Sequence, residues 1–139
     1  MVKANVLDTV FDLMALDVRS GENMNDPVWV GRILAAVINA NDENGLLVEK
    51  WKGPYNDGEK PWAWGDASQI FQEYHNHGRP VKYGQSMTYA AVMITACRAL
   101  GIPCRPVTIY DTIRDPDNNI KADGPPTVQE NETHVCHRL

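Results

Sequence analysis

Apolar side chains recur every three to four positions in two segments near the start of the chain, the spacing that predicts amphipathic helices. The first predicted helix covers residues 5–17, and the second runs from Pro27 to about Ile38. Asp26 can accept hydrogen bonds from the unpaired N–H groups of the second helix, and a proline in the first turn sacrifices no hydrogen bond. The apolar positions are Val6, Leu7, Val10, Phe11 and Met14 in the first segment and Trp29, Ile33, Ala36 and Val37 in the second.

A short apolar piece and a third helix follow. The piece is residues 46–48, and a polar loop with several turn-forming residues covers 52–60. Asp66 followed by Gln69 resembles a capping box, which marks the start of a helix. Gly78 is a typical residue at the end of one. The buried stripe of this predicted helix consists of Ile70, Phe71 and Tyr74.

The helix predicted to begin at Ser86 differs from the others because it carries apolar residues on most of its faces. Such a helix is expected to be central and buried. Gly101 and Pro103 end it. Residues 105–110 alternate and are rich in β-branched side chains, so they predict a strand, and residues 127–139 can begin another. Helices come first and a central helix then feeds the strands. This order indicates an α+β domain whose antiparallel sheet is incomplete when the chain ends.

The composition excludes several classes of protein. The chain has 139 residues, of which 43% are hydrophobic, enough for one domain with one core. Its net charge of -5 argues against a general nucleic-acid binder. No apolar run approaches the roughly 20 residues of a membrane span, and the first residues lack the apolar run of a signal peptide. Cys97, Cys104 and Cys136 are too few for a disulfide scaffold. We therefore expect a reducing compartment, with the protein cytoplasmic or released without a signal peptide.

Ser86 stands where a glycine turn, "KYGQS", feeds the central helix. A helix N-terminus is the positive end of the helix dipole and presents unpaired N–H groups. A cysteine at this place would have its thiolate favoured, and the N–H groups can stabilise an oxyanion during acyl transfer. A serine hydroxyl stays protonated at neutral pH and needs a well-placed base. Two interpretations stay open: a nucleophile position, or a helix N-cap, which serine forms well.

The segment "VKYGQSMTYAAVMITACRALGIPCRPVTIYD" resembles the active-site segment of the animal transglutaminases, in which Tyr-Gly-Gln-Cys-Trp opens a buried helix that ends in Arg-x-Leu-Gly-Ile-Pro. The upstream segments "NDPVWVGRILAAVINANDENGLLVEKW" and "DGEKPWAWGDASQIFQEYHNHGRPVKYGQ" resemble the same family. The resemblance covers roughly residues 5–135 with few gaps. It implies a papain-like α+β fold, with residues 1–139 forming a single truncated core domain.

The resemblance assigns roles to three residues. Ser86 takes the place of the family's nucleophilic cysteine, which accepts the acyl group of a protein glutamine and passes it to an amine, often a protein lysine. His134 in "ETHVCH" takes the place of the catalytic histidine, and the indole of Trp64 that of the N–H donor to the oxyanion. The orienting Asp of the family lies on a later strand, beyond Leu139. The alternatives are a strand histidine that contacts a neighbour and a tryptophan that packs in the core.

The resemblance also implies calcium sites in two loops rich in oxygen ligands, which Ca²⁺ prefers. The alternative for both loops is a solvated turn, since Asn and Asp favour turns in any case. The first set is the carbonyl of Ala36, the side chain of Asn39, the carbonyl of Asn41 and the carboxylate of Glu43. The second set is Asp115, Asp117 and Asn119.

Two other metal arrangements are weaker. His134, Cys136 and His137 could hold zinc with Cys104 as a fourth ligand, but their spacing matches no structural zinc motif. The "HNH" at residues 75–77 lacks the spaced partners of a nuclease site and is expected to be the end of a solvated helix.

Two functions follow from these features. The first is part of a calcium-dependent protein-glutamine gamma-glutamyltransferase that acts on protein glutamine and on lysine or other amines, impaired because Ser86 replaces the cysteine and the orienting Asp is absent. The second is a non-catalytic scaffold or binding protein of the same descent. Ser86 decides between them only if it is the natural residue, because replacing Cys by Ser is also a deliberate way to silence such an enzyme.

Overall fold

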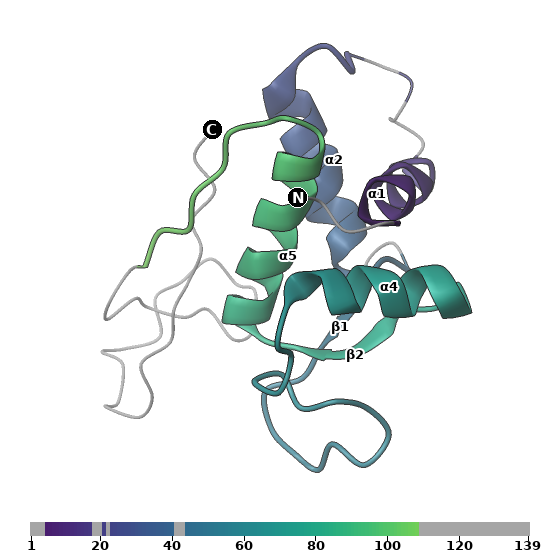
Figure 1. Ribbon diagram of the computed structural model, residues 1–139, viewed down its shortest axis with the longest axis vertical. Helices are drawn as coiled ribbons and strands as arrows, with labels where there is room; N and C mark the ends of the chain where they lie inside the picture. Colours follow the sequence, from purple (N-terminus) through teal and green to yellow (C-terminus); the bar gives the residue numbers. More distant parts are fainter. Residues whose placement is uncertain (1–4, 18–20, 22, 41–43, 109–139) are drawn as a thin grey trace, which may run out of the picture.

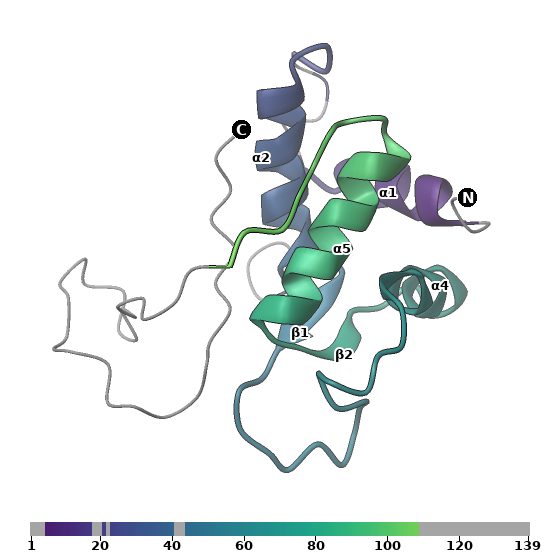
Figure 2. The same cartoon turned by 60° about the vertical axis from the view of Figure 1, so that its left-hand side comes forward.

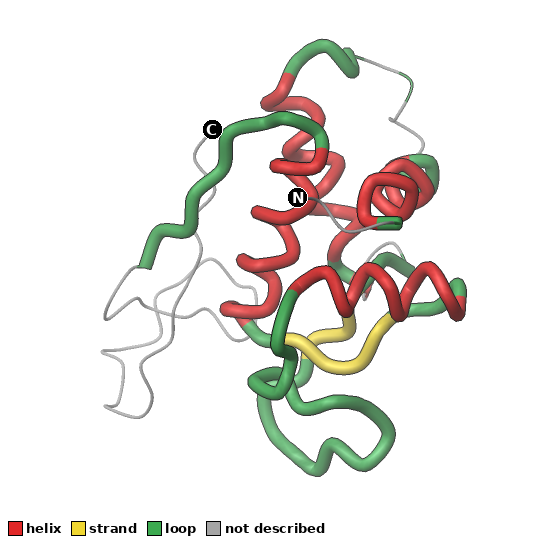
Figure 3. The backbone as a smooth tube through the Cα atoms, viewed as in Figure 1, coloured by secondary structure: helices red, strands yellow, loops and turns green. Residues whose placement is uncertain are grey.

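A computed structural model describes residues 5–17, 21, 23–40 and 44–108. In it, helix α5 stands beside α2, with α1 and α4 on one side and a small sheet at its lower end (Figure 1). The long loop between β1 and α4 extends below the sheet (Figure 3). The elements are α1 (Val6–Met14), α2 (Pro27–Ile38), β1 (Leu47–Glu49), α4 (Ala67–His77), β2 (Val81–Gly84) and α5 (Ser86–Ala99).

The helix boundaries follow from the capping residues that the sequence pattern indicated. The Asp26 carboxylate accepts a hydrogen bond from the N–H of Val28 at 2.9 Å. The Asp66 carboxylate accepts one from the N–H of Ser68 at 3.0 Å. Gly78 ends α4 in the left-handed conformation, with φ 59°. These caps satisfy backbone groups that a helix leaves unpaired at its ends. The first helix ends at Met14, three residues earlier than predicted.

The core lies where α1, α2, α4 and α5 meet. Phe71 from α4 is its largest fully buried side chain, and Val10, Val37 and Val92 from the other three helices are equally inaccessible to solvent. Burying a side chain of this kind contributes about 1.5 to 3 kcal/mol. The apolar pattern of α5 predicted a helix buried on most of its faces. One face is open to solvent, since Met87 is 64% exposed. Among the described residues, nothing covers that side of the helix.

The two described strands, which both precede α5, pair in parallel, so they do not test the antiparallel sheet predicted after that helix. Leu47 is opposite Val81 and Val48 is opposite Lys82, with a break in register before Glu49. The strand predicted at 105–110 does not form over its described part, 105–108. Pro103 and Pro106 bracket the start of that segment, and proline donates no hydrogen bond to a sheet. The remainder of that strand and the one predicted at 127–139 lie outside the described residues. The α+β class itself is confirmed, with four helices and this two-stranded sheet in the described part.

Candidate functional site

Ser86 is the first residue of α5, and Gln85 rather than Ser86 is the N-cap. The Gln85 side chain accepts from the N–H of Thr88, and the Gln85 N–H donates to the Thr88 hydroxyl at 3.3 Å. Among the described residues, none forms a hydrogen bond with the Ser86 hydroxyl. The side chain is half-buried. The cap interpretation of Ser86 is therefore wrong, and its hydroxyl lies beside the unpaired N–H groups of the first helical turn.

The amide nitrogen of Gln85 joins this corner to the loop that follows β1. It is 3.3 Å from the carbonyl oxygen of Lys50, 3.2 Å from that of Trp51 and 3.4 Å from the hydroxyl of Tyr55. An amide NH₂ has two N–H donors, so these three acceptors share them. One side chain thus caps α5 with its oxygen and holds the loop with its nitrogen.

Two further side chains of α5 fasten its first turns. The hydroxyl of Thr88, which is buried, donates to the carbonyl of Pro61 at 3.0 Å. The hydroxyl of Tyr89 donates to the carbonyl of Leu47 in β1 at 2.6 Å. Leaving a buried hydroxyl or carbonyl unpaired costs about 1 to 3 kcal/mol, so these bonds fix the start of the helix against both the loop and the sheet.

The outer edge of β2 is attached to the same loop through Asp57. Its carboxylate accepts from the Lys82 ammonium and from the Tyr83 hydroxyl, each at 2.7 Å. These two hydrogen bonds, with that of Lys82 the stronger cause, lower the pKa of Asp57 to about 2. The backbone continues the contact, since the Glu59 N–H donates to the Lys82 carbonyl and the Tyr83 N–H to the Glu59 carbonyl.

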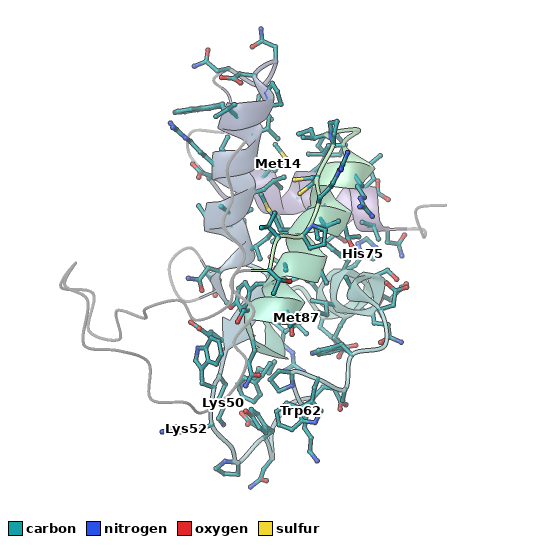
Figure 4. The ribbon with its side chains drawn as sticks, turned by 90° about the vertical axis from the view of Figure 1, so that its left-hand side faces the viewer. Met14, Lys50, Lys52, Trp62, His75 and Met87 are labelled. Atoms are coloured by element: carbon teal, nitrogen blue, oxygen red, sulfur yellow. The ribbon has the colours of Figure 1, made fainter. Side chains whose placement is uncertain are left out.

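An aromatic group forms the outer surface of this corner. The rings of Tyr55 and Trp62 meet edge to face with centroids 5.5 Å apart, and the Lys50 ammonium lies 4.5 Å from the centroid of Tyr83. Trp62 is 67% exposed. Figure 4 shows Lys50, Trp62 and Met87 at the same end of the molecule, two from the loop and one from the start of α5.

Both the sequence and the fold of this chain match known proteins. Residues 47–138 match the transglutaminase-like superfamily. The chain belongs to the transglutaminase-like superfamily. It is 44% identical over 103 residues to protein-glutamine gamma-glutamyltransferase 2 of Pagrus major, covering 73% of this chain and 15% of that protein. It is 42% identical over 100 residues to the human protein-glutamine gamma-glutamyltransferase E, covering 71% of this chain and 14% of that protein.

The fold matches as well as the sequence. The crystal structure of red sea bream transglutaminase superposes with a TM-score of 0.69 and 38% identity, over 76% of this chain and 17% of that one. This confirms the predicted papain-like transglutaminase core. The chain spans about one sixth or less of the length of these relatives.

Trp64, the indole that the resemblance assigns to the oxyanion, is engaged elsewhere in this transglutaminase-like chain. Its indole N–H donates to the Tyr83 carbonyl at 2.9 Å, and its ring packs against the core. It also lines an open, polar groove of about 370 Å³ together with Asp57, Arg79 and Lys82. Its role as an oxyanion donor stays a prediction, and it requires Trp64 to release Tyr83.

Trp51 is a second indole at this corner, and it was not among the predicted site residues. Its carbonyl accepts from Gln85, the neighbour of Ser86, and its indole N–H donates to the carboxylate of Glu49. The available signal was its position at the end of the segment "LLVEKW", which itself resembles the transglutaminases.

The other predicted site residues are only partly within the described chain. Ala36 and Asn39 lie together at the end of α2, where the Asn39 N–H donates to the Ala36 carbonyl at 3.2 Å. A carbonyl oxygen has a second lone pair and Asn39 a side-chain oxygen, so both fit a hard cation. The rest lie outside the described residues: Asn41, Glu43, Asp115, Asp117, Asn119, His134, Cys136 and His137.

Two smaller expectations can be compared with the described part of the chain. His77 pairs with Glu73 one turn earlier on α4, 3.4 Å apart, and both side chains are about half exposed. His75 is also exposed. The "HNH" segment is thus the solvated end of a helix. Within the described ranges, no helix is long and apolar enough to cross a membrane.

Proposed function

We propose that this chain carries the nucleophile corner of a protein-glutamine gamma-glutamyl acyl-transfer core, and that Ser86 leaves it impaired. The proposed acyl donor is a protein glutamine and the acceptor a protein lysine or another amine. The observation that carries the proposal is the Ser86 side chain, placed at the first position of α5, beside unpaired backbone N–H groups, with its hydroxyl bonded to none of the described residues. Both curated relatives described above are named as transferases of this kind.

The chemistry at this corner depends on the atom at position 86. A thiolate there would attack the carboxamide carbon of glutamine, and the nitrogen would leave as ammonia with a proton from the imidazolium of the proposed His134. The amine would then attack the resulting thioester, give its proton to that histidine and release the thiolate. The N–H of residue 86 would donate to the oxyanion that forms in each step. A serine hydroxyl must lose its proton to a base at the moment of attack. The proposed base is His134. Because a serine hydroxyl is much harder to deprotonate than a thiol, the chain as it stands should show no measurable transfer.

For the second oxyanion donor we favour Trp51 over Trp64. Both indole N–H groups are engaged, that of Trp64 by the Tyr83 carbonyl and that of Trp51 by the exposed Glu49 carboxylate, which can rotate away. Of the two, Trp51 is the one whose backbone is hydrogen-bonded to Gln85, the neighbour of Ser86. In a chain that transfers, Trp51→Ala should reduce transfer by roughly 100-fold or more. Trp64→Ala would loosen β2 and lower stability more than it lowers the rate at saturating substrate.

Calcium dependence is part of the proposal. Ala36, Asn39, Asn41 and Glu43 would hold one Ca²⁺ at the turn between α2 and β1, and Asp115, Asp117 and Asn119 a second. Calcium should raise the melting temperature by mass action. Asn39→Ala and Glu43→Ala should each remove the heat of one of the two binding events in calorimetry, while Asn76→Ala at the exposed end of α4 should change neither. A full complement of binding heat in both turn variants would contradict the first site.

A second candidate, a non-catalytic scaffold of transglutaminase descent, is favoured by Ser86 itself. The decisive experiment is Ser86→Cys. The helix dipole should favour the thiolate, so an alkylating reagent should modify position 86 at least about tenfold faster than Cys97. Met87→Cys is the matched control, because it tests exposure at the same helix end without the first helical position. Equal rates at positions 86 and 97 would contradict the nucleophile position.

Transfer is measured separately, as incorporation of a labelled amine into a glutamine-rich protein with millimolar calcium. The serine chain should show no incorporation above a reaction without protein. Incorporation at the rate of an intact transglutaminase would overturn the proposed impairment. The Ser86→Cys chain, extended through the strand that bears the orienting Asp, should gain transfer. Lack of transfer in the extended cysteine form, with a reactive thiol present, would favour the scaffold.

A further inference from the structure

The opposite end of α5 brings two cysteines together. The helix ends at Ala99, and Gly101 takes the left-handed conformation with φ 80°. The Gly101 N–H donates to the Arg98 carbonyl at 3.1 Å, and the Ile102 N–H donates to the Cys97 carbonyl at 2.9 Å. These two bonds make a Schellman motif, which reverses the direction of the chain. Figure 2 shows the segment after α5 folding over the helix end and running back along it.

A side-chain clamp holds the returning segment in place. The guanidinium of Arg98 donates to the carbonyl of Cys104 at 3.1 Å. Cys104 is thereby held against the core beside the helix, half-buried. Cys97 lies in the core and is only 1% exposed. Burial raises the pKa of the Cys97 thiol to about 12, and the electrostatic effect of the neighbouring Cys104 is the second cause. Cys97 is a member of the core cluster against which Cys104 packs, although seven positions separate the two in sequence.

We propose that Cys97 and Cys104 are a covalent modification site that closes to an intramolecular disulfide, independently of any acyl transfer. The turn fixed by backbone hydrogen bonds and the Arg98 clamp bring Cys104 back to the core cluster that contains Cys97, and a disulfide requires such a close approach of its two cysteines. Cys97 and Cys104 are both free thiols in the structure. The bond would join α5 to the segment that leaves it, over the Schellman turn.

The oxidant is a low-molecular-weight disulfide such as glutathione disulfide. The thiolate of Cys104, the more accessible of the two, attacks one glutathione sulfur, forms a mixed disulfide and releases one glutathione thiolate. The thiolate of Cys97 then attacks the Cys104 sulfur and releases the second. The two protons lost by the protein thiols go to the two glutathione thiolates. Two thiols and one glutathione disulfide therefore give one protein disulfide and two glutathiones.

The full 139-residue chain with Cys136→Ser is equilibrated with glutathione redox buffers, quenched by alkylation and digested with trypsin. Trypsin cuts at Arg98, between the two cysteines, so the disulfide links peptide 83–98 to peptide 99–114. We expect this linked pair in mass spectrometry, and its loss on reduction. The same measurement in denaturant gives the extent of disulfide formation in the unfolded chain, in which the turn does not hold the two cysteines together. The folded chain should form the bond at least about tenfold more favourably than the unfolded chain, because the turn holds the thiols together.

Two variants make the result specific. Arg98→Lys keeps a tryptic site and a positive charge but loses the guanidinium clamp, so the preference of the folded chain should shrink. Cys104→Ser should leave Cys97 unlinked and protected from alkylation in the folded state. An equal extent of closure in folded and unfolded chains would overturn the proposal. So would a folded chain that stops at the glutathione mixed disulfide on Cys104.

Discussion

The two ends of α5 are built from different parts of the chain. At its start, side chains make the connections: Gln85, Thr88 and Tyr89 bond to a loop and a strand more than 25 residues away in sequence. At its end, the backbone closes on itself within five residues, with Gly101 as the pivot. The first end keeps helix N–H groups available beside Ser86, whereas the second uses its carbonyls in the turn. A helix end that is to do chemistry therefore has to be positioned by other elements, because its own backbone groups are needed elsewhere.

Gly58→Ala should have the largest effect, because it disrupts the loop that positions the first end of α5. A Cβ at Gly58 would lie 2.5 Å from the Cβ of Lys82 and 2.8 Å from its carbonyl oxygen, so the loop and β2 could not keep their contact. Thermal or urea unfolding should show a loss of about 2 to 3 kcal/mol. Gly65→Ala is the matched control from the same loop, because its nearest neighbour would be 3.8 Å away. A neutral Gly58→Ala would show that the loop is not held against β2.

Gln85→Ala tests the side-chain network itself. It removes the N-cap of α5 and the amide that holds the loop, and should cost about 1 to 2 kcal/mol in urea unfolding. In the Ser86→Cys background it should also bring the reactivity of the introduced thiol down toward that of Cys97, because the loop no longer fixes the corner. Gln72→Ala, on the exposed face of α4, should change neither quantity. An unchanged thiol rate in the Gln85→Ala chain would show that the corner does not depend on this residue.

Gly101→Ala tests the other end. No heavy atom would lie within 4 Å of the new Cβ, so the cost comes from φ 80° alone and should be about 1 kcal/mol. Gly101→Asn should lose less, because asparagine tolerates the left-handed conformation. Neither change should alter the thiol reactivity at position 86. Equal stability of the alanine and glycine forms would mean that the turn is not held in the left-handed conformation.

The smallest expected effect is the pH dependence from Asp57. Its pKa is lowered from 3.8 to about 2 in the folded chain, so the stability it adds is present above pH 3.8 and is lost as the pH falls toward about 2. The melting temperature of Asp57→Asn should therefore fall less steeply than that of the parent over this interval. The difference should shrink at high salt, because the pair with Lys82 is exposed. Identical slopes would show that the pair contributes nothing.

The parts of the fold that could be predicted from the sequence are the ones decided within a few residues. Asp26 and Asp66 cap their helices through neighbouring N–H groups, and Gly78 ends α4 by its own backbone conformation. The corner at Ser86 was found through its motif. The residue that caps it was missed, because glutamine is an unusual N-cap and its amide partners lie 30 to 35 residues away.

The failures have a common physical origin in contacts between distant segments. The alternation at 105–110 indicates strand propensity, but a strand requires a partner, and none forms over 105–108. The apolar residues on the Met87 face of α5 predict that this face can be buried. They do not indicate which segment would cover it, and no described segment does. The engagement of Trp64 depends on the carbonyl of Tyr83 nineteen residues later, and no local pattern reports which way that carbonyl points.

The length of α5 determines how its two ends can communicate. Its 14 residues span about 20 Å, and the bonds described at one end share no residue with those at the other. Substitutions more than about 10 Å apart without shared partners usually add within roughly 0.5 kcal/mol. A double-mutant cycle between Gln85→Ala and Gly101→Ala should therefore close near zero. The disulfide at one end of α5 and the residue at position 86 at the other end can therefore be changed separately, without either change altering the effect of the other.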